Sequence, residues 1–241
     1  MRRFGGILLV AVGLLFVAVS MVRADIAMPR DKWSDIRMVS EHVKIVLSPT
    51  DITVEGTYFL ENQKEALTAV VGYPRGVMEK SLEDFTVTVD GEVVTVSSQA
   101  GSKDERVPRM GPAPSKTGEA VKSAYQFDGP YPECKTFSVK FDAKQQRKVV
   151  VKYHVAPAEV KSVDKGSLLA FIYTLKTGAT WRGKIDSAVI EASLKGLSMQ
   201  DIVTVTPKTV SKTDAATAPL MWVFKDFKPT QDIEITFRAP K

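Results

Sequence analysis

The stretch Phe85–Val96 reads FTVTVDGEVVTV and shows most directly how this chain folds. Its first part, residues 85–89, alternates apolar and polar side chains, which is the period of a β-strand with one buried face. Asp90 and Gly91 separate it from a second β-branched run, Val93–Val96. A type I′ turn needs positive φ at both central positions, and Asp-Gly is one of the pairs that favour it. The stretch therefore predicts an antiparallel β-hairpin.

The same alternation continues outward from the hairpin in both directions. Further strands are predicted at Val43–Leu47, Ile52–Leu60, Leu67–Tyr73, Phe137–Phe141, Val149–Val155, Ile202–Val205, Leu220–Phe224 and Ile233–Phe237. Leu168–Leu175 is instead a nearly continuous apolar run, which suits a central strand. Ile185–Leu194 fits both a strand and a helical face, and we assign it to a strand because its surroundings are β. No repeated alternation of strand and helix is present, which disfavours a parallel α/β sheet. We predict an all-β fold of mostly antiparallel strands.

The length of 241 residues is enough for one large or two small domains. We predict two β-sandwich-like units, residues 25–157 and 158–241, with the boundary in the Pro-containing stretch Ala156–Lys165. Residues 97–122 contain few large apolar side chains and much Gly, Pro, Ser and charge. This composition predicts a long mobile loop within the first unit.

The first 24 residues predict an export signal. Arg2 and Arg3 precede the uncharged apolar run Ile7–Val22, and small residues stand at the −3 and −1 positions of a cleavage site before Asp25. Cleavage there predicts a periplasmic or secreted protein with no membrane span. The alternative is an uncleaved anchor, because Phe4–Val22 is just long enough to cross a bilayer.

Composition and charge limit the classes of partner. The hydrophobic content of 44% and the charged content of 25% are ordinary for a globular protein. The formal net charge is +5, but three of the arginines lie in residues 1–24. The mature chain has 30 bases and 28 acids, a net charge of +2. A nucleic-acid partner is not expected, because it requires a strongly basic surface.

No motif predicts a catalytic residue, a metal site or a cofactor. Cys134 is the one cysteine, so it cannot form an intramolecular disulfide. His42 and His154 are the only histidines, each in a strand pattern that points it to solvent, and two isolated histidines do not make a zinc site. Gly178–Lys184 spells most of a phosphate-binding loop, but Ile185 stands where Ser or Thr should hold magnesium.

The candidate binding residues surround Trp181. This tryptophan lies in a turn beside Lys176, Arg182 and Lys184, whereas Trp222 lies in an apolar strand and is expected in the core. An exposed aromatic ring on a loop can stack on a sugar or anchor a partner protein. We therefore predict a patch at Trp181 for an envelope protein or a glycan. The alternative is that Trp181, like Trp33, covers an open end of the sandwich.

Two blocks of this sequence resemble a known family. They are YTLKTGATWRGKI at Tyr173–Ile185 and WVFKDFKPT at Trp222–Thr230. The N-terminal half is also similar, over Met38–Leu47, Thr53–Asn62 and Val70–Pro74. The family consists of exported bacterial proteins and is known only as a domain of unknown function. The resemblance implies export and a β-rich fold, and it brings no catalytic residues.

Together these features favour a non-enzymatic binding or assembly protein of the bacterial cell envelope. The first alternative is an envelope hydrolase, or an accessory to one, with a site too dispersed to recognise in the sequence. A weaker alternative is stress-related scaffolding. If the protein acts by binding, we expect a solvent-exposed Trp181 with basic neighbours. If it is an enzyme, we expect a deep pocket with converging titratable groups.

Overall fold

A computed structural model shows a protein built almost wholly of β-strands, which confirms the predicted all-β class. The structure describes residues 35–75, 81–100, 133–162, 166–209 and 219–239. The predicted signal peptide, Trp33 and most of the predicted 97–122 loop lie outside these ranges. Within them, no helix is long and apolar enough to cross a membrane.

One layer of the fold is a seven-stranded sheet with the order β13-β11-β1-β2-β8-β4-β5. Its strands are β1 (Ile36–Leu47), β2 (Ile52–Asn62), β4 (Glu83–Val89), β5 (Glu92–Val93), β8 (Gln146–Val155), β11 (Ile185–Leu194) and β13 (Leu220–Phe227). All neighbours pair antiparallel except β1 and β11, which are parallel. A parallel pair requires a crossover connection, and here the chain passes through both layers between the two strands.

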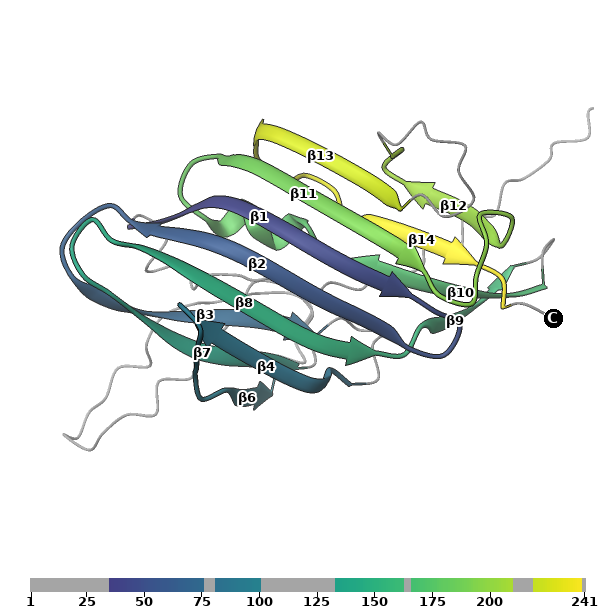
Figure 1. Ribbon diagram of the computed structural model, residues 1–241, viewed down its shortest axis with the longest axis horizontal. Helices are drawn as coiled ribbons and strands as arrows, with labels where there is room; N and C mark the ends of the chain where they lie inside the picture. The colour runs from purple at the N-terminus through teal and green to yellow at the C-terminus, as the bar shows by residue number, and fades with distance from the viewer. Residues whose placement is uncertain (1–34, 76–80, 101–132, 163–165, 210–218, 240–241) are drawn as a thin grey trace, which may run out of the picture.

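Two smaller sheets form the second layer and lie behind the seven-stranded sheet in Figure 1. One has the order β12-β14-β10-β9 and the other the order β3-β7-β6. Their strands are β3 (Leu67–Arg75), β6 (Ser97–Ala100), β7 (Glu133–Phe141), β9 (Ala158–Ser162), β10 (Gly166–Tyr173), β12 (Ile202–Thr206) and β14 (Ile233–Phe237). The four residues of β6 pair with β7, so the start of the predicted 97–122 loop is a strand, and that part of the loop prediction is wrong.

The local predictions that depend on turn chemistry and strand period are confirmed. Asp90 has a φ of 51° and Gly91 a φ of 94°, as a type I′ turn requires. Val89 pairs with Glu92 across this turn. The ambiguous run Ile185–Leu194 is a strand, and it pairs with β1 on one side and β13 on the other.

The seven-stranded sheet crosses the boundary that we placed after residue 157. β1, β2 and β8 come from the first predicted unit, and β11 and β13 come from the second. Val43 of β1 lies beside Ile190 of β11, and both belong to one core cluster that includes buried side chains of the two units. The β-branched and aromatic residues of the two predicted units therefore pack into one hydrophobic core.

Two hydrogen-bonded tyrosine pairs tie the layers together. The hydroxyl groups of Tyr58 on β2 and Tyr173 on β10 are 3.1 Å apart. The Tyr73 hydroxyl on β3 donates to the Tyr153 hydroxyl on β8 at 2.9 Å. A buried pair of hydroxyl groups therefore joins the seven-stranded sheet to each smaller sheet, within a largely apolar core. Buried hydroxyl groups find partners because an unmade hydrogen bond in the interior is costly.

Gly56 is the position where a side chain would disturb this arrangement most directly. A Cβ atom at Gly56 would lie 2.3 Å from the hydroxyl oxygen of Tyr58 and 2.6 Å from its Cζ. The hydrogen bond to Tyr173 holds that ring in place. We expect Gly56→Ala to lower the free energy of unfolding by about 1–3 kcal/mol, the usual range for overpacking, measured by urea denaturation.

The control for Gly56→Ala is the same substitution in a Tyr58→Ala background. Removal of the ring leaves room for the new methyl group, so the second substitution should add little to the loss caused by the first. Strict additivity of the two losses would contradict the clash as the cause.

Candidate functional site

The segment that carries the predicted binding patch closes one end of the sandwich. It runs from β10 through the short 3-10 helix η2 (Lys176–Thr180) to Trp181 and then into β11. Trp181 is only 2% exposed and is among the largest fully buried side chains. The expectation of a solvent-exposed Trp181 is therefore wrong. The amide of Arg182 donates to the carbonyl of Ile36 at 3.2 Å, which fixes this segment against the start of β1 while the indole lies in the core.

The three basic residues of the predicted patch have separate surroundings. Lys176 is partly buried, and both its amide, at 3.0 Å, and its ammonium group, at 3.6 Å, contact the buried carboxylate of Asp232. Lys184 forms an exposed ion pair with Asp226 at 2.9 Å. Arg182 is exposed. They do not surround an exposed aromatic ring, and the Lys184 pair contributes little stability because solvent screens it.

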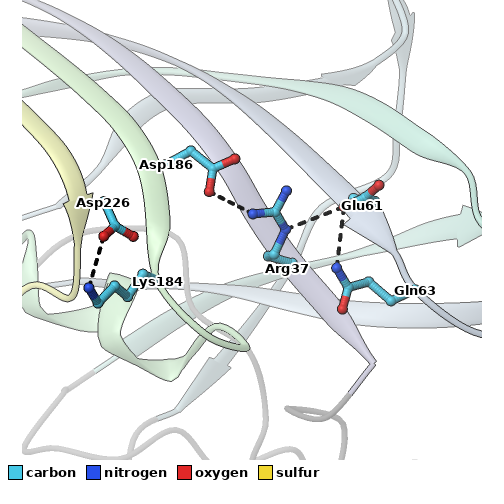
Figure 2. Close-up of polar contacts among 6 residues, drawn as sticks. All are labelled: Arg37, Glu61, Gln63, Lys184, Asp186 and Asp226. Carbon is cyan, nitrogen blue, oxygen red and sulfur yellow. Dashed lines mark hydrogen bonds and ion pairs between the residues drawn. The ribbon is translucent and has the colours of Figure 1, made fainter.

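A surface network links three strands of the large sheet near this segment (Figure 2). The Arg37 guanidinium on β1 contacts Asp186 on β11 at 2.6 Å and Glu61 on β2 at 3.3 Å, and Gln63 donates to Glu61 at 3.4 Å. Partial burial alone lowers the pKa of Arg37, but the two carboxylates outweigh it and raise that pKa. The network holds β1 between its neighbours and leaves Arg37 fully engaged with protein carboxylates.

Glu41 is the most unusual side chain in the described part of the chain. It lies on β1, is 3% exposed, and faces the core with Val43 and Ile45. Its neighbours across the sheet are Tyr58 on β2 and Ala188 on β11. Neither carboxyl oxygen has a hydrogen-bond partner among the residues that the structure describes. A buried polar group without a partner costs a few kcal/mol of stability.

Burial raises the pKa of Glu41 to about 8. The side chain is therefore a neutral carboxylic acid at pH 7, with one hydrogen-bond donor and remaining acceptor capacity. Glu234 on β14 differs, although burial and then the negative charge of Asp232 also raise its pKa. Glu234 stands between the core residues Ile233 and Ile235, so it projects from the opposite face of its strand.

A simple signal could have revealed Glu41 in the sequence. The alternation that places Val43, Ile45 and Leu47 on the buried face puts Glu41 on the same face, two residues earlier. A β-bulge between Met38 and Ser40 shifts the register, so the buried residues before it have the opposite parity. The buried acid thus sits directly after an irregularity of the strand.

The two histidines, Trp222 and Cys134 have ordinary places in the fold. His42 and His154 face solvent as predicted, with side chains 46% and 41% exposed, and each contacts an acid. Trp222, predicted in the core, is 1% exposed, and Cys134 is a buried free thiol. Among the described residues there is no group of three or more His, Cys, Asp or Glu side chains that could hold a metal ion.

A pocket of about 480 Å³ lies at the end of the sandwich where the β1–β2 turn meets the β8–β9 connection. Its lining includes Pro49, Pro157, Leu169 and a single ionisable side chain, Glu159. One exposed carboxylate does not form a set of converging catalytic groups. The pocket is therefore a weaker candidate for chemistry than the buried acid on β1.

Comparisons with known proteins identify a solved structure with a similar fold. No protein-family model and no curated protein sequence matches this chain. The crystal structure of a candidate nutrient binding protein from Legionella pneumophila is similar, with a TM-score of 0.63 and 16% sequence identity. The match covers 89% of this chain and 72% of that one. At this level of identity the likeness shows a shared fold and nothing further.

A second solved structure, of an M1 zinc metallopeptidase variant from Deinococcus radiodurans, matches with a TM-score of 0.42 and 7% identity. The match covers 87% of this chain but only 43% of the metallopeptidase. This chain therefore corresponds to less than half of the length of that enzyme.

Proposed function

We propose that this protein is an exported, non-enzymatic binding protein of the bacterial cell envelope. The observation that carries the binding role is Glu41, a core carboxyl group whose two oxygens have no partner among the described residues. The stability lost by keeping such a group is recovered when a ligand supplies the missing hydrogen bonds. The similar fold of the Legionella pneumophila protein, a candidate nutrient binding protein, agrees with this role.

Export is supported by the sequence of residues 1–24, which has the order of a cleavable signal: arginines, an apolar run and small residues before Asp25. The resemblance to exported proteins of unknown function at Tyr173–Ile185 also supports export. We propose the periplasm or the extracellular space as the place where the mature chain, residues 25–241, binds its ligand or an envelope partner.

A hydrolase is the second candidate, and Glu41 is also the observation that favours it. A carboxylic acid with a raised pKa can act as a general acid. Catalysis needs a second group, such as a nucleophile or a base, beside it. The flanking positions across the sheet are Tyr58 and Ala188, which do not form such a pair with a carboxyl group. Binding is therefore the better supported role.

The test begins with the full chain expressed in a Gram-negative host. We expect the protein in the periplasmic fraction, with an intact mass that places its first residue at Asp25. The purified mature chain is then screened by thermal unfolding against amino acids, amines, short peptides, sugars and peptidoglycan fragments. A ligand present at 100 times its Kd should add about 2.7 kcal/mol to the free energy of unfolding.

Each failure in this test has a distinct meaning. Membrane retention with residues 1–24 still attached would replace the cleaved signal by an anchor. Turnover of any compound in the screen, followed by mass spectrometry, would replace binding by hydrolysis. No stabilising compound and no turnover would remove the proposed small-ligand binding role.

A further inference from the structure

One row of core-facing side chains crosses four adjacent strands of the large sheet. Its members are Phe224 on β13, Ala188 on β11, Glu41 on β1 and Tyr58 on β2, each directly opposite the next. Neighbouring strands lie about 4.8 Å apart, so both aromatic residues stand within two strands of the carboxyl group. Ala188, beside Glu41, extends no further than a methyl group. The row thus places Tyr58 directly beside Glu41 on one side and Phe224 two strands away on the other.

A hydrogen bond joins this row to the second layer. Tyr58 bonds the Tyr173 hydroxyl at 3.1 Å, and Tyr173 ends β10 just before η2. Four residues later, the hydroxyl group of Thr177 is buried, and it has no hydrogen-bond partner among the described residues. Tyr173 thus connects the row, through Tyr58, to the segment that carries this buried hydroxyl group.

We propose that Glu41 binds the ammonium group of a small organic cation between the two layers, with Tyr58 and Phe224 flanking it. The proposal rests on the proposed binding function and names its ligand class. A carboxylate is the natural counter-ion of an ammonium group, and aromatic rings attract cations through their negative faces. A protonated amine would supply donors to both oxygens of Glu41, which are unpartnered in the described structure.

Charge at this site favours a cation over an anion. β2 places Tyr58 beside Glu41 and β11 places Ala188 there, so neither neighbouring strand brings a basic side chain to it. Tyr58 is in turn hydrogen-bonded to Tyr173 on β10. The nearest basic residue along the second-layer segment, Lys176, is already engaged with Asp232. An anionic ligand would meet no cationic side chain from these strands, whereas a cation would meet an acid that can ionise.

Binding of an ammonium group should be coupled to release of a proton. Burial keeps Glu41 protonated in the free protein at pH 7, because its pKa is about 8. An ion pair with the ligand favours the carboxylate, so the proton leaves to the buffer as the cation arrives. About 0.9 proton per bound ligand is expected at pH 7. An uncharged ligand at the same place would leave Glu41 protonated and release none.

The test is calorimetric titration of the mature chain at pH 7 with n-butylammonium, benzylammonium and glycinamide. n-Butanol, benzyl alcohol and glycolamide serve as uncharged partners. Titration in phosphate and in MOPS separates the heat of binding from the heat of buffer protonation. We expect at least one amine to bind about 10-fold or more tightly than its alcohol. Glu41→Gln should lose both that preference and the proton release, and Glu234→Gln should keep both.

The outcomes separate this site from the general binding role. Glu41→Gln removes a buried titratable group without loss of volume, so it is expected to fold, and circular dichroism checks this. Equal affinity of amine and alcohol, or proton release that persists in Glu41→Gln, overturns the ammonium site. If no amine binds while an uncharged compound stabilises the protein in the thermal screen, the ammonium site fails and the binding function stands. If nothing binds in either experiment, both fail.

Discussion

Trp181→Ala is expected to lower the free energy of unfolding by about 3–5 kcal/mol, the usual cost of removing a buried tryptophan. Trp181 is 2% exposed and lies in the core cluster, so its removal leaves a large cavity that the surrounding strands cannot close. For a chain of this size, that loss should reduce the Tm by roughly 10 °C. Urea denaturation followed by far-ultraviolet circular dichroism measures the loss without relying on the fluorescence of the removed indole.

The exposed neighbours of Trp181 provide the matched controls. Arg182→Ala and Lys184→Ala change the same segment at solvent-exposed positions, and each should alter stability by no more than about 0.5 kcal/mol. A Trp181→Ala loss as small as theirs would contradict the buried position of the indole. It would then restore the predicted surface patch. A large loss confined to Trp181 assigns the block Tyr173–Ile185 to closure of the sandwich end.

The fold could be predicted from the sequence where neighbouring residues decide it. The period of two in Ile233–Phe237 and the Asp90-Gly91 pair specify a strand and a turn almost without regard to the rest of the chain. The parallel pairing of β1 with β11 could not be predicted in this way. Their partner residues, such as Val43 and Ile190, are separated by most of the chain, and no local pattern encodes which strands meet.

The candidate site could be predicted less well, for two physical reasons. The sequence left two interpretations of Trp181 open, an exposed ring and a ring that covers the end of the sandwich. Packing against distant parts of the chain, such as the start of β1 that the Arg182 amide contacts, decides between them. The alternation of the strand could have predicted that Glu41 is buried, because it lies two residues before Val43 and on the same face. Its importance comes from what surrounds it, Tyr58 and Ala188 on other strands. A charged residue on an apolar face becomes informative only when its partners are known.

Glu41→Gln is expected to become progressively more stable than the parent protein as the pH rises from 4 to 7. The pKa of Glu41 is about 8 in the folded chain, against an ordinary value of 4.5 for a solvated glutamate, so the folded state binds the proton more tightly than the unfolded chain does. The stability that protonated Glu41 contributes is fully present below pH 4.5 and is lost as the pH rises through 8. The difference in free energy of unfolding between variant and parent should therefore grow by about 3 kcal/mol between pH 4 and pH 7.

Asp90→Asn gives a control of opposite sign for the Glu41 experiment. Slight burial opposes the change, but the side chain of Arg147 and the amide of Lys148 together lower the pKa of Asp90. Its contribution is therefore present above the unfolded pKa and is lost as the pH falls, so this variant should differ from the parent most at neutral pH and least in acid. Urea titrations at each pH measure both profiles. If the Glu41→Gln profile runs parallel to the parent from pH 4 to 8, the carboxyl group is not held protonated in the core, and the ammonium site loses its source of released protons.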